Sequence, residues 1–215
     1  MNYNFVNLIF AFNRDLLKVE QTGARTLGAK ELEYAKICIR EEADELANTW
    51  SVEDDQDRAV EQVDAFVDAL YFSVGHLYRM GNTEESATND LRHHFDGVGT
   101  FDMPIEMDGV EALHVEALGA FRNRMISNVE SLHGLDRELD CYRVEATIEC
   151  AMGGLLCIGL TKEQIYRVIE IVDEKNKQKK KGSNAKRDLG IEDAVKPEGW
   201  TSPESAIKEY LFGAK

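Results

Sequence analysis

The sequence predicts an all-α protein, folded as an antiparallel helical bundle with a polar C-terminal tail. Apolar residues recur at intervals of three and four over several long segments, which is the spacing of one helix face. Two helix-start signals support this: Thr161 with Gln164 forms a capping box, and Pro203 follows Ser202 as in a first helical turn. No segment shows a convincing alternation typical of a strand.

Three helices are expected in the first part of the chain. Residues 5–20 carry large apolar residues at helical spacing, and residues 28–49 follow a turn that contains glycine. Residues 57–80 carry a regular row of valines and leucines and end at Gly81 and Asn82, a typical C-terminal signal. The short connections predict that these three helices run antiparallel.

Further helices are expected after a long polar stretch. Residues 82–108 are polar and contain several glycines, which predicts a surface connection. Helices then follow over residues 110–132 and 137–157, and a sixth begins after Thr161 and ends in the basic segment 175–182. A short helix closes the tail.

The composition limits the classes of function. The chain has 215 residues and a formal net charge of −15, which disfavours duplex nucleic acid as a partner. No apolar run is long enough to span a membrane, and the first residues lack the basic flank of a signal peptide, so a cytoplasmic protein is expected. The four cysteines form no CxxC pair and are expected to be free thiols.

Two predicted helices carry carboxylates where a buried face is expected. On the second helix, the apolar stripe reaches Glu42 and Glu45 with the same spacing as the apolar residues before them. On the third helix, Glu61, Asp64 and Asp68 form a row between two apolar rows, within an arc of roughly 60°. Both rows therefore point inward.

Inward-pointing carboxylates predict a divalent cation. Burying several of them together is costly unless a cation is coordinated among them. Oxygen ligands without histidine or thiolate favour Mg²⁺, with Mn²⁺ as a possible substitute. Since Mg²⁺ keeps waters and usually bridges to phosphate, the expected substrate is a polyphosphate. The acids of residues 51–57 lie on no apolar stripe and are expected on the surface.

The two acidic segments resemble a known family. EEADEL (41–46), followed by DAFVDALYFSVGHLYRMG (64–81), looks like the signature of the all-α NTP pyrophosphohydrolases, which include MazG-like enzymes, phosphoribosyl-ATP pyrophosphohydrolases and dimeric dUTPases. GLTKEQIYRVIEIVDEKNKQKKKG (159–182) is similar to the helix and Asn/Lys segment of many phage-encoded members. The resemblance implies a single catalytic domain over residues 1–181, with an inserted loop-helix region at about 82–150 and a tail over 182–215.

The resemblance also implies roles for the first acidic row. The family's EExxE motif falls on Glu41, Glu42 and Glu45, with Glu42 and Glu45 as metal ligands. Glu41 is turned by about 100° from them and is expected either to orient a water or to face solvent.

The second acidic row departs from the family pattern. Asp68 fits the last residue of the family's ExxD motif, but the position three before it is Ala65. Either Asp64 replaces the missing acid, or Glu61 and Asp64 form the literal ExxD. Both registers remain open.

The basic segment after the sixth helix is the expected phosphate-binding region. Asn176 and Lys179 match the family's Asn/Lys segment, and Lys177 lies between them. The alternative is that these lysines only complement the dipole of the preceding helix.

The expected activity is Mg²⁺-dependent hydrolysis of ribo- or deoxyribonucleoside triphosphates to the monophosphate and pyrophosphate. The resemblance further implies a homodimer or homotetramer that controls nucleotide pools. Two alternatives remain: a base-specific dUTPase, dCTPase or dGTPase, and a non-enzymatic acidic helical interaction protein. Candidate residues for stacking on a base are Phe12, Trp50, Tyr71 and Trp200.

Overall fold

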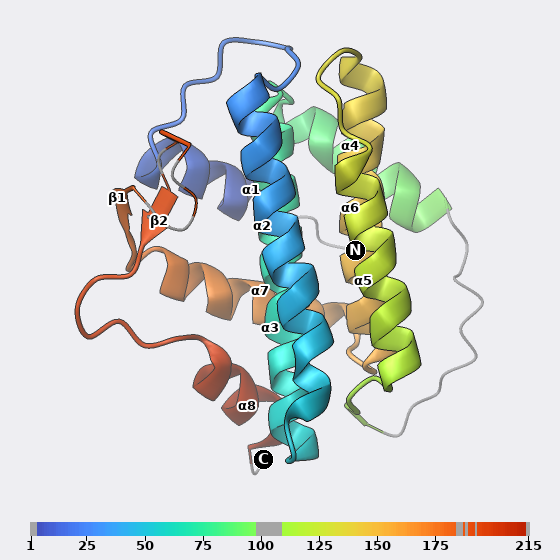
Figure 1. The fold of residues 1–215 in the computed structure, drawn as a ribbon. Coiled ribbons are helices and arrows are strands. Elements are labelled where there is room, and N and C mark those ends of the chain that lie inside the picture. The colour runs from blue at the N-terminus through green and yellow to red at the C-terminus, as the bar shows by residue number, and fades with distance from the viewer. Residues whose placement is uncertain (1–3, 98–108, 184–186, 188, 192, 214–215) are drawn as a thin grey trace.

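The structure is a computed structural model that describes residues 4–97, 109–183, 187, 189–191 and 193–213. It is mostly helical, as the sequence predicts (Figure 1). The elements in chain order are α1 (Asn4–Ala11), a π-helical turn (Phe12–Leu16), α2 (Ala29–Asn48), a 3₁₀ turn (Thr49–Ser51), α3 (Asp55–Arg79), α4 (Glu84–Gly97), α5 (Val115–Glu130), α6 (Arg137–Cys157), α7 (Lys162–Asn176), β1 (Lys180–Gly182), β2 (Asp193–Val195) and α8 (Glu204–Phe212).

Four long helices form the centre of the molecule. α2 packs along α3 and α5, and α6 packs along α3 and α5, so that the four helices surround a common apolar core. Figure 1 shows α2 and α5 running side by side through the molecule. The stretch at about 82–150 therefore contributes two core helices to the fold.

One glycine allows α3 and α6 to approach closely. A Cβ atom at Gly154 would lie 2.2 Å from Cζ of Phe66, well inside van der Waals contact. Phe66 is fully buried, and its ring meets the ring of Phe121 edge to face, with centroids 5.3 Å apart. The Phe66 ring thus fills the space that a side chain at position 154 would occupy.

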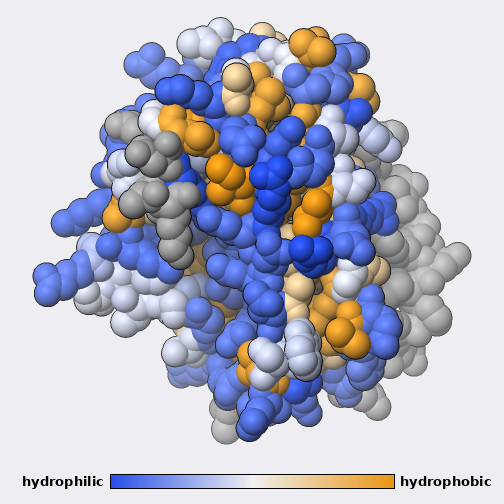
Figure 2. Space-filling view, in the orientation of Figure 1, coloured by the Kyte–Doolittle hydropathy of each residue, from blue (hydrophilic) through white to orange (hydrophobic). Residues whose placement is uncertain are grey.

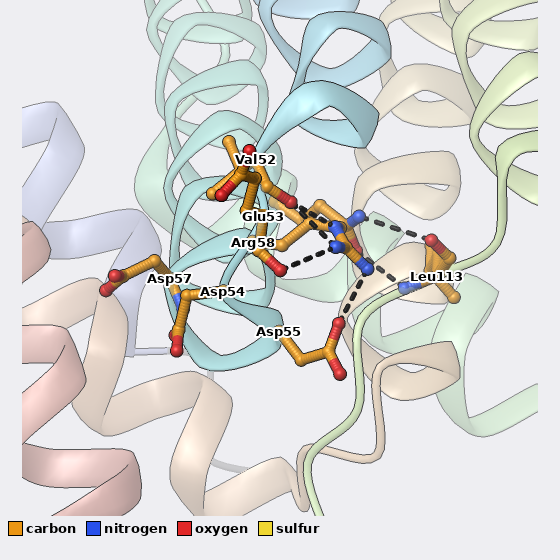
Figure 3. A network of polar contacts seen from close by, with 8 residues as sticks. Val52, Glu53, Asp54, Asp55, Asp57, Arg58 and Leu113 are labelled. Carbon is orange, nitrogen blue, oxygen red and sulfur yellow. Dashed lines mark hydrogen bonds and ion pairs between the residues drawn. The ribbon is translucent and has the colours of Figure 1, made fainter.

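The turn from α2 to α3 is held by Arg58 (Figure 3). Its Nε and Nη2 donate to the Val52 carbonyl at 2.9 and 2.7 Å, and its Nη1 donates to Asp55 at 2.8 Å. Asp54 caps α3 by accepting from the Asp57 backbone N–H at 2.9 Å. These contacts fix the start of α3 relative to the end of α2.

Three acids of this turn, Glu53, Asp54 and Asp55, are exposed, as the sequence predicts. Glu61, which belongs to the second acidic row on α3, is also exposed, so the prediction that it points inward is wrong. The turn acids serve the fold as caps and surface ion pairs.

The first predicted helix ends early. The sequence predicts a continuous helix over residues 5–20, whereas α1 gives way to a π-helical turn after Ala11, and Lys18 has a left-handed φ of 57°. The Asn13 amide donates to the Ile9 carbonyl at 3.0 Å within this change of helix type. A side-chain hydrogen bond of this kind competes with the regular helical pattern.

The expectation of a surface connection over residues 82–108 is wrong for its first half. α4 covers Glu84–Gly97, with the Thr83 hydroxyl accepting from the Ser86 N–H at 3.1 Å. Ala87 and Leu91, one turn apart, are fully buried. Two apolar residues give too weak a periodicity to predict a helix. The second half, residues 98–108, lies outside the described residues.

The expectation of no strands is also wrong. β1 and β2 form an antiparallel pair in which Lys181 faces Ala194. Each strand has three residues, which is too short for an alternating pattern to show in the sequence. The pair lies on the same side of α2 and α3 as α7 and α8 (Figure 1).

The C-terminal helix packs against the bundle. α8 contacts α3 and α7, its Ile207 is fully buried, and Lys208 Nζ lies 2.5 Å from an oxygen of Asp57. α8 begins at Glu204, with Pro203 as the residue before it.

The face seen in Figure 2 is largely hydrophilic, with hydrophobic side chains in small scattered groups. Among the described residues, no single helix is long and apolar enough to cross a membrane, although α6 and α7, which meet at 114°, pass the length and composition criteria as a pair.

Candidate active site between two acidic helices

Six carboxylates from α2 and α3 line one cavity: Glu41, Asp44 and four that we call the acidic cluster, namely Glu42, Glu45, Asp64 and Asp68. The cavity has a volume of about 710 Å³, within the range of about 300–1,000 Å³ usual for small-molecule sites. The inward direction expected from the spacing of the two rows therefore brings these four residues together.

The packing of α2 decides how deeply its two acids lie. Ala43 and Leu46, next to them in the sequence, are fully buried against the core. Glu42 lies beside this buried face and is only 4% exposed, whereas Glu45 lines the cavity but is exposed, so its predicted inward position is only partly met. Asp64 and Asp68, one turn apart on α3, are half-buried.

Burial and mutual repulsion disfavour the charged forms of these carboxyl groups. Burial is the largest cause of the raised pKa of Glu42, and Asp68 and Glu45 add to it. Burial also raises the pKa of Asp64 and of Asp68; Asp68 raises that of Asp64 further, while Lys179 opposes the shift at Asp68. The acidic cluster is therefore stabilised by whatever supplies positive charge, whether protons or a cation.

The donor atoms fit a hard divalent cation. They are all carboxylate oxygens, the ligands that Mg²⁺ and Mn²⁺ prefer. Asp64 Oδ1 is buried and has no hydrogen-bond partner among the described residues, so it has an oxygen free for coordination. Among those residues, no three His, Cys, Asp or Glu side chains are gathered tightly enough to hold a metal ion as they stand. A cation would have to draw the repelling carboxylates together.

Glu61 lies apart from the acidic cluster. Its side chain is exposed and lines a smaller neighbouring pocket, which it shares with Glu45 and Asp64. Of the two registers left open by the sequence, the one with Asp64 and Asp68 places both acids in the large cavity.

Glu41 is held by an arginine. Arg187, in the segment between β1 and β2, donates from Nε to Glu41 Oε2 at 2.6 Å and from Nη1 to Asp193 Oδ2 at 3.1 Å. Its Nη2 lies 3.9 Å from Glu42 Oε1, and its guanidinium lies over the Phe72 ring. Arg187 therefore partly neutralises the α2 side of the cavity.

Two lysines, Lys179 and Lys196, also line the cavity, and together with Arg187 we call them the basic wall. The Nζ atoms of Lys179 and Lys196 lie 5.1 and 4.7 Å from the centroid of the Trp200 ring. The Trp200 indole is fixed in turn, because its N–H donates to the Lys175 carbonyl at 3.1 Å. Trp200 thus holds two cations next to the acidic cluster.

The three predicted phosphate-binding residues separate in the structure. Asn176 and Lys179 line the cavity. Lys177 does not: its Nζ lies 2.5 Å from Asp173 Oδ2, and Asp173 also accepts a hydrogen bond of 2.9 Å from the Tyr71 hydroxyl. The prediction that Lys177 contacts the substrate therefore gains no support from the structure. The ion pair of Lys177 with Asp173 is a contact within the fold.

Several cavity residues were not expected from the sequence. Arg187 and Lys196 are isolated basic residues in a polar tail, without a motif around them. Glu204, in the first turn of α8, adds a further carboxylate, which raises the pKa of Asp64. An acid in a first turn reads as an ordinary helix-start signal, so nothing in the sequence marks it for a site.

Aromatic side chains form part of the cavity lining: Phe12, Tyr34, Tyr71, Phe72 and His76. Of the four stacking candidates, Phe12, Tyr71 and Trp200 line the cavity, whereas Trp50 is 62% exposed and lies outside it.

Comparisons of the chain with protein-family models, with curated proteins and with solved structures give no match. The chemistry of the site is therefore inferred from its own residues.

Proposed function

We propose that the protein is a Mg²⁺-dependent nucleoside triphosphate pyrophosphohydrolase, which cleaves its substrate to monophosphate and pyrophosphate. One observation carries the proposal: the acidic cluster and the basic wall line the same cavity, which is of nucleotide size. The acids suit the cations that accompany a triphosphate, and the lysines suit its oxygens.

Each wall has a separate task in this proposal. Glu42, Glu45, Asp64 and Asp68 would hold Mg²⁺, which supplies charge neutralisation on the phosphates and a water of lowered pKa. Lys179 and Lys196, whose Nζ atoms both lie over the Trp200 ring, bind phosphate oxygens directly. The cavity walls position the chain of phosphates relative to the acids.

Attack at the α-phosphorus follows from the resemblance of residues 41–46 and 64–81 to the pyrophosphohydrolase signature. A base-specific dUTPase, dCTPase or dGTPase would use the same chemistry with a more selective base pocket. The same resemblance suggests a homodimer or homotetramer, which sedimentation analysis would test.

A non-enzymatic acidic interaction protein is the second candidate. Such a protein would present its carboxylates to solvent for a partner to contact. Here Glu42 is almost fully buried, and the exposed acids of the α2–α3 turn are used as caps and ion pairs. The inward orientation favours a small ligand over a protein surface.

Product analysis tests the proposed function. The protein is incubated with Mg²⁺ and each common ribo- and deoxyribonucleoside triphosphate, and the products are separated by ion-exchange chromatography. Monophosphate and pyrophosphate are expected, and Glu42→Gln and Asp68→Asn should each abolish them. Glu53→Gln, in an exposed residue of the turn, is the control. Diphosphate and orthophosphate as products, or full activity in both site variants, would refute the proposal.

A further inference from the structure

His76 on α3 is a buried histidine without hydrogen-bond partners. Its side chain is 2% exposed, and neither Nδ1 nor Nε2 has a partner among the described residues. Buried polar atoms are nearly always paired, because an unpaired one loses the hydrogen bonds that it makes with water. His76 also lines the cavity of the acidic site.

The surroundings of His76 suit a flat, partly apolar ligand. The Tyr34 ring meets the His76 ring edge to face, with centroids 6.0 Å apart, and Phe72 lines the same part of the cavity. Gly75, next to His76, also lines the cavity, and a Cβ atom there would lie 3.0 Å from the Asn13 amide nitrogen. The absence of a side chain therefore lets the Asn13 amide, which also lines the cavity, approach the α3 backbone at this point.

The imidazole is neutral at pH 7. Burial, with a smaller contribution from Arg79, lowers the pKa of His76 to about 3. A neutral imidazole offers one N–H donor and one nitrogen acceptor. A bare phosphate chain presents only acceptors to such a group, whereas the edge of a nucleobase presents donors and acceptors side by side.

His76 is also set apart from the acidic cluster along the same helix. It follows Asp68 by eight residues, which corresponds to about 12 Å at ~1.5 Å per residue. One ligand that reaches both ends must therefore have a charged part and, at a distance from it, an uncharged part.

We propose that the His76 end of the cavity is a nucleobase subsite, in which the imidazole pairs with the hydrogen-bonding edge of the base beside Tyr34 and Phe72. The inference rests on the proposed function, because it takes the phosphates of the same molecule to lie at the acidic cluster. It adds that the protein selects nucleotides over bare polyphosphates, and that His76 determines this specificity.

Direct binding tests the subsite without turnover. Calorimetry with Mg²⁺ compares inorganic tripolyphosphate with the non-cleavable α,β-imido analogues of dATP, dCTP, dGTP and dUTP. The wild-type protein should bind at least one analogue roughly tenfold or more tightly than tripolyphosphate. His76→Phe, which keeps an aromatic ring of similar size, should remove that preference and leave tripolyphosphate binding unchanged.

Two further variants make the outcome specific to the imidazole. His76→Gln keeps a donor and an acceptor and should retain part of the preference. His114→Phe changes an exposed histidine outside the cavity and should retain all of it. If His76→Phe does not fold, the wild-type comparison and His76→Gln decide the question on their own.

Equal affinity for tripolyphosphate and all four analogues would overturn the inference, as would an unchanged preference in His76→Phe. The proposed function fails separately: a protein that prefers a nucleotide through His76 but releases no pyrophosphate keeps the subsite and loses the assigned reaction. Conversely, a protein that releases pyrophosphate from triphosphates but binds tripolyphosphate as tightly as every analogue keeps the assigned reaction and loses the subsite.

Discussion

The Tyr34 hydroxyl on α2 donates a hydrogen bond of 3.0 Å to Asp193 in β2, which joins two residues 159 positions apart in the chain. Asp193 also accepts from Arg187, and Arg187 returns to α2 through Glu41. The helix that supplies Glu42 to the cavity thus also anchors the strand pair and Arg187 of the basic wall. Loss of these anchors should be measurable as loss of stability.

Arg187→Gln should lower the free energy of unfolding by about 1.5–3 kcal/mol, because charged hydrogen bonds to Glu41 and Asp193 are lost. Urea unfolding followed by circular dichroism measures the change. Arg14→Gln, which removes an exposed ion pair with Asp15, is the control and should not shift the unfolding midpoint measurably. Equal stability of the two variants would mean that the Arg187 contacts contribute nothing to the fold.

Glu42→Gln should stabilise the metal-free protein at pH 7. Burial and neighbouring acids raise the pKa of Glu42 above its unfolded value, so its stabilising contribution is present below about pH 4.5 and is lost as the pH rises through the folded pKa. Glutamine cannot ionise, so the variant does not lose stability in this way as the pH rises. Thermal unfolding with and without Mg²⁺ tests the pair of expectations: the ion should raise the Tm of the wild-type protein and raise that of Glu42→Gln less.

Substitutions of Lys177 and Lys179 should have different effects, one on stability and one on substrate binding, although the two residues are only two positions apart. Lys177→Ala removes the partner of the buried Asp173 carboxylate and should cost about 1 kcal/mol of stability with unchanged KM. Lys179→Ala removes a cation that lines the cavity and should raise KM roughly tenfold with little change in Tm. Steady-state kinetics and thermal unfolding of both variants check the contrast, and a reversed pattern would contradict the placement of the basic wall.

Two helical glycines give a matched test of the core. Gly154→Ala places a methyl group against the Phe66 ring and should destabilise the protein by about 1–3 kcal/mol through overpacking. Gly119→Ala on α5 meets no atom within 4 Å and should stabilise it by about 0.5–1 kcal/mol, because alanine favours the helix. Chemical denaturation of the two variants measures both signs.

His76 should make the protein sensitive to acid. Its folded pKa of about 3 lies below the usual histidine pKa of 6.5, so the unfolded chain binds a proton first and stability falls as the pH drops from about 6.5 toward 3. His76→Phe should lose stability less steeply over this window. Parallel denaturant titrations at several pH values compare the slopes, and identical slopes would show that His76 is not held neutral by the fold.

The sequence predicts the long helices well because their apolar spacing is regular over many residues. α6 has the predicted bounds, and α2 and α3 differ from prediction by one or two residues at each end. α4 and the two strands escaped prediction, since Ala87 and Leu91 are the apolar contacts of a short polar helix and three-residue strands have no period. A periodic pattern of apolar residues can be recognised only in a segment of several turns or several strand residues.

The acidic half of the candidate site follows from the same spacing, because helical geometry alone places Glu42 near Glu45 and Asp64 near Asp68. The basic half does not. Arg187 and Lys196 reach the cavity through a loop and a strand whose path is decided by tertiary contacts such as that of Asp193 with Tyr34. His76 lies on a predicted helix, but its lack of partners is visible only once the neighbours are placed.

The order of the two walls along the chain has a consequence for biosynthesis. The acidic cluster is complete by Asp68, whereas Lys179, Arg187 and Lys196 leave the ribosome only after the core helices between them. Because domains generally fold from the N-terminal side during synthesis, the nascent chain carries an uncompensated acidic groove until translation is nearly finished. A product that ends after α7 would lack all three residues of the basic wall, so the last segment is needed for a complete site.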